Sequence, residues 1–442
     1  MIVRAAVQTA ILTGLLCSSV LSVRAAENAP TMLPPVSVQT EGQAVPCDEE
    51  LVHDCFSWKA YSFAFAPDSK SLFFSYRYIN GVSYFPDGQV YRSAQEAAQA
   101  TAAMRKPTLS SPVLARIFLD RPDQPERIAA FPFCSTNLDQ TKVSRDGKSI
   151  VVRMDDGMQI GVMDLQSRKL VRVAGPDYGF DARVSEPVFS KDGGTIYFRS
   201  DFDRGAYIRS VPSDGGDIAN LYPEPPVRQC HGYFCGYARG KGPNRALAKS
   251  SDFQLSGGGK TLLMLAQYEG TSDELVDFAR KSGYGSIDRT TLIYALDLAS
   301  NTFSLSPINH DWAAKRFTHA EGSRQFERMT VDLEGNIFLL FGLHERQDDD
   351  YIYAYNPGPP IRFEKAFDLR PARKMRIVDF AVSPDHDWIA YSFQKFLRKE
   401  NRGAWIDTVV IANRRTGQEF RLRMGDPLFR DLVWACAPQA AP

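Results

Sequence analysis

The sequence predicts an all-β fold, a β-propeller of six four-stranded blades with loop and short-helix insertions. Two observations predict it. One strand-turn-strand pattern recurs six times between residues 63 and 390. Most copies are followed by a third strand that ends in an acidic or amide residue, and then by a fourth, more polar strand. Four antiparallel strands joined by short turns make one propeller blade.

The recurring pattern is an apolar strand, a tight polar turn and a second, strongly apolar strand. Its six copies span 63–74, 143–152, 188–198, 255–264, 331–339 and 382–390. Asp-Gly pairs such as Asp146-Gly147 tolerate the positive φ values of tight hairpins, and the Asp side chain can bond the turn backbone. Aromatic and β-branched residues on either side suit a buried strand. Each copy is therefore predicted to be a hairpin.

The third strands and the spacing of the turns complete the prediction. Third strands are predicted at 160–165, 292–297, 351–356 and 409–413. The turns fall at 68, 146, 192, 258, 334 and 385, and the shortest steps match a blade of about 40–50 residues. The longer steps need insertions, which we place at 93–104 and 272–281 (short helices), 223–249 and 310–324. A seventh blade stays open, because 431–434 reads as another innermost or closing strand, and a β-sandwich with coincidental hairpins is the alternative fold.

The N-terminus is typical of an exported protein. Arg4 is followed by an apolar stretch, and Val23-Arg24-Ala25 offers small residues at the −3 and −1 cleavage positions. We predict a signal peptide at 1–25, an N-terminal extension at 26–57, the propeller at 58–436 and a tail at 437–442. The predicted location is the periplasm, without a transmembrane anchor. A lipoprotein anchored at Cys17 is the alternative, although Leu16 is bulky where a lipobox needs a small residue.

Six cysteines remain after the predicted signal: Cys47, Cys55, Cys134, Cys230, Cys235 and Cys436. An even number in an exported chain favours disulfides, but six cysteines allow 15 pairings and the sequence does not decide among them. Short loops favour Cys47 with Cys55 and Cys230 with Cys235, which would leave Cys134 with Cys436. A metal site is the alternative; the short-spaced cysteine clusters that zinc needs are missing from the sequence.

The turn phrase resembles that of a known repeat. Ala66-Pro67-Asp68-Ser69-Lys70, Ser144-Arg145-Asp146-Gly147-Lys148, Ser190-Lys191-Asp192-Gly193 and Ser383-Pro384-Asp385 are degenerate forms of Ser-Pro-Asp-Gly-Lys before an apolar strand. This phrase resembles the TolB-like (WD-like) propeller repeat, from about Trp58 to Trp434. The resemblance implies a fold more than a function. Relatives include a periplasmic protein–protein hub of the Tol–Pal system, whose amino-terminal α/β domain has no counterpart here, and the propeller of prolyl oligopeptidase-type hydrolases.

The sequence shows no motif that carries chemistry. It contains no Gly-x-Ser-x-Gly elbow, His-Glu-x-x-His, P-loop or dinucleotide fingerprint. The six histidines are scattered, and the acidic runs 348–350 and 155–157 do not match a calcium loop. We therefore predict no catalytic residue, no cofactor and no metal.

The insertion at 223–249 is the most unusual surface feature. Aromatic and basic side chains alternate there, and such surfaces are favoured at protein interfaces. The candidate partner-binding residues are Tyr222, Arg228, Tyr233, Phe234, Tyr237 and Arg239. A loop that covers a propeller edge explains the same residues equally well.

The functional prediction follows from export, fold and charge. Lys plus Arg and Asp plus Glu both number 52, which gives no electrostatic reason to expect nucleic acid. We predict a monomeric, non-catalytic periplasmic propeller that binds a protein or envelope component. The alternative is a propeller enzyme, a hydrolase or lyase, with its site in the central funnel. Convergent Asp, Glu, His and Arg around a concave pocket would favour the enzyme, and an apolar rim would favour binding.

Overall fold

The structure is a computed structural model of the 442-residue chain. It describes residues 31–32, 56–80, 83–84, 108–109, 113–122, 126–130, 141–154, 159–175, 183–202, 205–222, 228–231, 234–237, 250–267, 291–308, 324–332, 335–343, 351–356, 362–368, 376–399 and 402–422. Within these ranges no helix is long and apolar enough to cross a membrane. The predicted signal peptide, both predicted short helices and the strand predicted at 431–434 lie outside them.

Among the described residues, six antiparallel sheets follow one another along the chain, each with a path of four strands in sequence order. The first is β2 (Phe56–Phe65), β3 (Ser71–Asn80), β6 (Val113–Phe118) and β7 (Glu126–Ala130). The second is β8 (Lys142–Val143), β9 (Ser149–Met154), β10 (Gln159–Asp164) and β11 (Leu170–Ala174). The third is β12 (Arg183–Phe189), β13 (Thr195–Phe202), β14 (Gly205–Pro212) and β15 (Ala219–Tyr222).

The remaining three sheets repeat this topology. The fourth is β18 (Ser250–Leu255), β19 (Thr261–Gln267), β20 (Thr291–Asp297) and β21 (Thr302–Leu305). The fifth is β22 (Arg324–Val331), β23 (Ile337–Leu343), β24 (Tyr351–Asn356) and β25 (Arg362–Asp368). The sixth is β26 (Arg376–Val382), β27 (Trp388–Lys399), β28 (Arg402–Asn413) and β29 (Glu419–Leu422).

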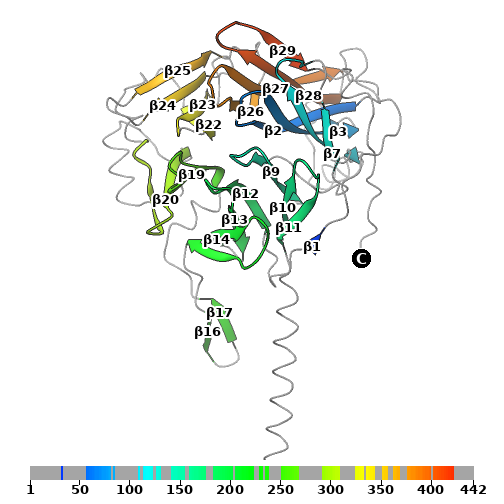
Figure 1. Cartoon of the computed structure of the whole chain (residues 1–442). Helices are drawn as coiled ribbons and strands as arrows, with labels where there is room; N and C mark the ends of the chain where they lie inside the picture. Colours follow the sequence, from blue (N-terminus) through cyan, green and yellow to red (C-terminus); the bar gives the residue numbers. More distant parts are fainter. Residues whose placement is uncertain are drawn as a thin grey trace, which may run out of the picture.

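Short strands join these sheets at their edges. β1 (Thr31–Met32) pairs with β11, β5 (Thr108–Leu109) with β3, and β4 (Ser83–Tyr84) with β28 of the sixth sheet. β16 (Arg228–His231) and β17 (Phe234–Tyr237) form a separate hairpin, which Figure 1 shows standing away from the sheets.

A buried apolar layer lies between each sheet and the next. Phe73 and Leu114 of the first sheet pack on Ile150 and Val152 of the second, and equivalent layers follow between the later pairs of sheets. The last layer packs Val409 and other residues of the sixth sheet against the first. Each sheet thus buries both faces against its neighbours, and Figure 1 shows the sheets side by side around a common centre. The all-β propeller prediction is confirmed.

The number of regular blades differs from the prediction. Five sheets have an innermost strand of six or more residues, whereas β8 of the second sheet contains only Lys142 and Val143. The prediction of six regular blades is therefore corrected to five complete blades and one sheet with a reduced innermost strand. The physical reason is local: Thr141-Lys142-Val143 contains a single apolar residue, whereas β2 and β12 have several.

The ring closes mainly by packing. In the described residues the first and sixth sheets each take their four strands from one contiguous segment, and they meet through the apolar layer around Phe74 and Ile411. The two-residue β4, from the insertion between β3 and β6, is the single ladder between these two sheets in the described part of the chain.

In the hairpin turns the Asp side chain bonds the turn backbone, as predicted: the N–H groups of Lys148 and Gly194 each donate to the aspartate two residues earlier at 3.1 Å. The turns also contain a serine whose hydrogen bonds were not predicted. In three sheets a serine before the turn donates its hydroxyl hydrogen to the aspartate two residues later: Ser144 to Asp146, Ser190 to Asp192 and Ser383 to Asp385. The same serine oxygen accepts the N–H of the first residue of the next strand, as Ser383 does from Trp388 at 2.9 Å. Because these bonds favour the ionised carboxyl, they lower the pKa of Asp146 and Asp192.

Candidate functional site

The innermost strands carry a bulge at matching positions. The ladder shifts between Tyr61 and Ala64 in β2, and equivalent shifts occur in β12, β18, β22 and β26. A polar residue six positions before the hairpin turn lies in the bulge in β2, β12 and β18, and directly after it in β22 and β26. We call these five residues the axial ring: Ser62, Glu186, Asp252, Arg328 and Asp379. Innermost strands line the axis of a propeller, so the ring lies around that axis.

Three ring residues have a backbone conformation that L-residues rarely adopt. The φ angles of Ser62, Glu186 and Asp252 are 52°, 55° and 53°. A non-glycine residue in this region costs about 1 kcal/mol or more. Such strain persists only where surrounding interactions hold it, and it is concentrated at functional sites.

The interactions that hold the bulges join each sheet to the next. The backbone N–H of Thr141 donates to Ser62 Oγ at 2.6 Å, and that of Phe253 donates to Glu186 Oε2 at 3.4 Å. The N–H of Met329 donates to Asp252 Oδ2 at 3.0 Å, and Arg328 Nε donates to the carbonyl of Val378 at 3.1 Å. Four of the five ring side chains thus bond the innermost strand of the following sheet or the residue just before it. Among the described residues no backbone ladder pairs these innermost strands with one another.

The ring also contains an ion pair that water reaches. Arg328 Nη1 lies 3.0 Å from Asp252 Oδ1, and the exposed fractions of the two side chains are 39% and 14%. Asp252 raises the pKa of Arg328 further above its ordinary value. Arg328 is therefore a fixed positive charge that remains accessible.

The other two carboxyl groups of the ring are harder to ionise. Burial, aided by the charge of Asp252, raises the pKa of Glu186 to about 7, although Arg199, Arg328 and Lys142 oppose the shift. Burial also raises the pKa of Asp379, against the opposing charges of Arg328 and Lys142. Raised carboxyl pKa values near a cation are typical of functional sites, although structural ion-pair networks produce them too.

The hairpin turns close one end of the axis. A Cβ at Gly335 would lie 3.0 Å from Gly257 Cα of the neighbouring turn, and the N–H of Asp385 donates to Ser69 Oγ at 3.1 Å. Arg145 of the second sheet bonds the carbonyl of Gly257 in the fourth sheet at 3.2 Å. Because one arginine side chain bridges turns two sheets apart, the axis is narrow at this end.

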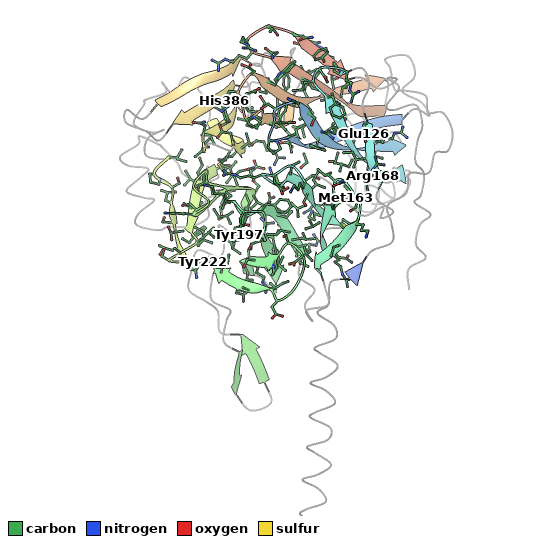
Figure 2. The ribbon with its side chains drawn as sticks, viewed as in Figure 1. Glu126, Met163, Arg168, Tyr197, Tyr222 and His386 are labelled. Carbon is green, nitrogen blue, oxygen red and sulfur yellow. The ribbon has the colours of Figure 1, made fainter. Side chains whose placement is uncertain are left out.

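One turn contact pairs a histidine with a buried carboxylate. His386 occupies the positive-φ position that Gly147 and Gly193 hold in other turns. The Nε2 atom of His386, the residue labelled in Figure 2, bonds Asp332 Oδ2 of the fifth sheet, and the His386 ring meets Phe338 edge-on at 5.3 Å. The Asp332 side chain is 1% exposed and also accepts the N–H groups of Gly335 and Asn336. This arrangement explains why a histidine stands where glycine is easier.

The structure separates the residues predicted for the partner-binding loop. Tyr222 ends β15 and stacks on Phe303 of the fourth sheet at 5.1 Å, so it lies on the propeller body, as Figure 2 shows. Arg228 is in β16, and Phe234 and Tyr237 are in β17. Tyr233 and Arg239 lie outside the described residues.

Of the three predicted cysteine pairs, one has both members within the described residues. Cys230 of β16 lies directly opposite Cys235 of β17, in the Cα register that a cross-strand bridge requires. Cys47, Cys55, Cys134 and Cys436 lie outside the described residues, as do the acidic runs at 348–350 and 155–157. Within the described ranges no group of three or more His, Cys, Asp or Glu side chains could hold a metal ion.

Sequence reasoning missed the axial ring. A usable signal exists: a polar residue stands six positions before the turn position in every repeat, as Glu186 does before Asp192 and Asp379 before Asp385, and five of these six residues form the ring. Three of the five are acidic and one is arginine. In isolation each reads as an ordinary polar residue of a strand.

These observations fix the architecture. The chain is a β-propeller. No protein-family model matches its sequence, and no curated protein matches it either. Solved structures resemble it at low identity.

A putative TolB from Agrobacterium tumefaciens is 14% identical, with 71% of this chain and 88% of that one covered and a TM-score of 0.40. TolB from Acinetobacter baumannii is 12% identical, with coverages of 84% and 80% and a TM-score of 0.42. An oligogalacturonate lyase from Vibrio parahaemolyticus is 9% identical, with coverages of 89% and 86% and a TM-score of 0.42. The function of this propeller has to be argued from its own residues.

Proposed function

We propose that this chain is an exported, non-catalytic propeller that binds a protein or envelope component in the periplasm, and that the axial ring is where the partner is held. The observation that carries the proposal is the Arg328–Asp252 pair, a fixed and solvent-reachable charge pair at the axis. The signal-like segment at 1–25 and the even number of cysteines support export.

The hydrogen bonding of the ring favours recognition over chemistry. Asp252 accepts a backbone N–H and an arginine, and Glu186 accepts the N–H of Phe253, so both carboxylates are held in place by the neighbouring sheet. Charges fixed before binding lose little entropy when a partner arrives, and they select partners of complementary charge. A partner that presents complementary charged groups would fit this ring.

A propeller hydrolase or lyase is the second candidate, and one observation favours it. Glu186, whose pKa is raised to about 7, shares the axis with the Arg328 guanidinium. A carboxyl that titrates near neutrality can act as a general acid or base, and an adjacent cation can stabilise a developing negative charge. Glu186 would then exchange a proton with the substrate while Arg328 holds an anionic group.

The experiment compares two arginine variants. The mature chain, Arg328→Gln and Arg421→Gln are immobilised and exposed to a periplasmic extract, and any retained component is purified and titrated against each protein. Arg421 lies on β29, where it pairs with Glu419 at the surface, so its variant is the matched control. We expect Arg328→Gln to weaken binding at least tenfold, about 1.4 kcal/mol, and Arg421→Gln to leave it unchanged.

Two results would contradict the proposal. Equal affinity of both variants for the retained component would remove the axial ring from the interface. A substrate that the wild-type chain converts, and that Glu186→Gln binds but does not convert, would establish the enzyme instead.

A further inference from the structure

A second charged site lies away from the axis, in the layer between the second and third sheets. Arg209 of β14 shares a face of the third sheet with Tyr207, two residues before it, and with Ser200, the ladder partner of Tyr207 on β13. Ile196 and Val211, which form another ladder pair on this face, pack against Val151 and Ile160 of the second sheet. The Arg209 side chain therefore projects into the layer between the two sheets.

The guanidinium of Arg209 lacks a counter-charge in the part of the chain that the structure describes. Its Cζ lies 5.6 Å from the centroid of the Tyr207 ring, and Tyr207 is 5% exposed. Its Nε is buried and has no acceptor among the described residues. Burial lowers the pKa of Arg209, and Tyr207 is the group that opposes the shift. A half-buried cation without a carboxylate is costly, and an incoming anion would offset that cost.

A separate observation points to the same place. The hydroxyl of Ser200 is 1% exposed and has no hydrogen-bond partner among the described residues. By the ladder register it lies diagonally across from Arg209 on the same face. Buried hydroxyls are nearly always bonded, so an unsatisfied one beside an unsatisfied guanidinium nitrogen indicates a missing acceptor. An oxyanion can accept from both groups at once.

A second arginine comes from the facing sheet. Arg153 of β9 stands two residues from Val151, on the side of the second sheet that packs against the third. A planar guanidinium suits bidentate contacts with phosphate, sulfate or carboxylate oxygens. We propose that Arg209 and Ser200 form a binding site for a small oxyanion of the phosphate, sulfate or carboxylate class between the second and third sheets. This site is independent of the axial ring.

The test measures the melting temperature of the mature chain with inorganic phosphate, with acetate and with sodium chloride at equal ionic strength. Binding to the folded state alone raises Tm, by about 2–4 °C for a ligand well above its Kd. We expect phosphate or acetate to raise the wild-type Tm above the chloride value. We expect Ser200→Ala to reduce that increment and Arg421→Met, an exposed arginine, to leave it intact.

Arg209→Met supplies the decisive comparison, because methionine keeps an unbranched apolar stem and removes the charge. We expect its Tm in chloride to equal or exceed that of the wild type and its increment with the oxyanion to vanish. Arg209→Lys, which keeps the charge without the planar fork, should retain part of the increment. Full retention of the increment in Arg209→Met, or no increment in the wild type with either oxyanion, would overturn the proposal.

Discussion

At the scale of single residues, Asp252 holds two sheets together and fixes a charge at the same time. Its Oδ2 accepts the N–H of Met329 on the fifth sheet, and its Oδ1 accepts Arg328. The bulge at Asp252, with φ of 53°, turns the side chain toward the next sheet. The local strain is thus compensated by bonds between sheets.

Removing the Asp252 carboxylate should therefore destabilise the propeller. Asp252→Ala leaves the Met329 N–H and the Arg328 guanidinium without their acceptor, and we expect a loss of about 2 kcal/mol in the free energy of unfolding. Asp217→Ala, at an exposed position of the third sheet, should change it by less than about 0.5 kcal/mol. Urea unfolding followed by circular dichroism measures both. Equal losses in the two variants would contradict the role assigned to Asp252.

Glu186 predicts a specific pH dependence of stability. Its pKa is raised from 4.5 to about 7 in the folded chain, so between these values the folded state binds more protons than the unfolded state. The favourable contribution of Glu186 to the free energy of unfolding is therefore complete below pH 4.5, and it is lost as the pH rises through 7. We expect Glu186→Gln to be more stable than the wild type at pH 8, by an amount on the order of 2 kcal/mol, and to lose part of this advantage at pH 5.

Denaturant unfolding at pH 5, 6, 7 and 8 measures this difference. The pKa of Asp379 is also raised, so the free energy of unfolding of Glu186→Gln should still fall as the pH rises, with a smaller slope than that of the wild type. Parallel stability curves for wild type and variant across this range would show that Glu186 is not held in a desolvated position.

At the scale of elements, the serine before each hairpin turn organises the turn. Ser383 is fully buried, donates to Asp385 and accepts the N–H of Trp388 at 2.9 Å. Ser383→Ala leaves that N–H without its side-chain acceptor, and we expect a loss of about 1–2 kcal/mol in the free energy of unfolding. Ser304→Ala, on exposed β21, is the matched control and should be nearly neutral. A neutral Ser383→Ala would mean that the Asp side chain suffices for the turn.

Two glycines allow the cost of the close contact between neighbouring turns to be measured apart from the cost of backbone strain within one turn. Gly193 has φ of +77° and open space where a Cβ would stand, whereas Gly335 has φ of +97° and a Cβ there would lie 3.0 Å from Gly257 Cα. Alanine at either position strains the backbone by about 1 kcal/mol or more. We expect Gly335→Ala to lose at least a further 1 kcal/mol or so, because the fourth and fifth sheets must separate. Thermal unfolding of both variants provides the comparison; equal losses would contradict the close packing of these turns.

At the scale of the whole molecule, the repeated hairpins predicted from the sequence are those that the structure contains. The Asp-Gly turns and apolar strands are local features, so a single sequence reveals them. The axial ring depends on ladder register: a bulge at Glu186 or Arg328 appears only when the partner strand is aligned. The stacking of Tyr222 on Phe303 depends on tertiary packing, which local patterns do not encode.

Radial closure is the central claim, because the axial ring, the turn contacts and both proposed sites depend on it. The first and last sheets are far apart in sequence, yet the N–H of Asp385 donates to Ser69 Oγ at 3.1 Å. A chain carrying Ser69→Cys and Asp385→Cys should therefore form a disulfide between these positions under mild oxidation. The control pair Ser69→Cys and Asp217→Cys joins the first sheet to an exposed position of the third and should not.

The most direct measurement is peptide mapping by mass spectrometry of both double variants, oxidised while folded and digested without reduction. Our account predicts a cross-linked peptide containing positions 69 and 385 in the first variant, and none containing 69 and 217 in the second. Absence of the first cross-link in folded protein, or equal yields of the two, would contradict closure of the propeller.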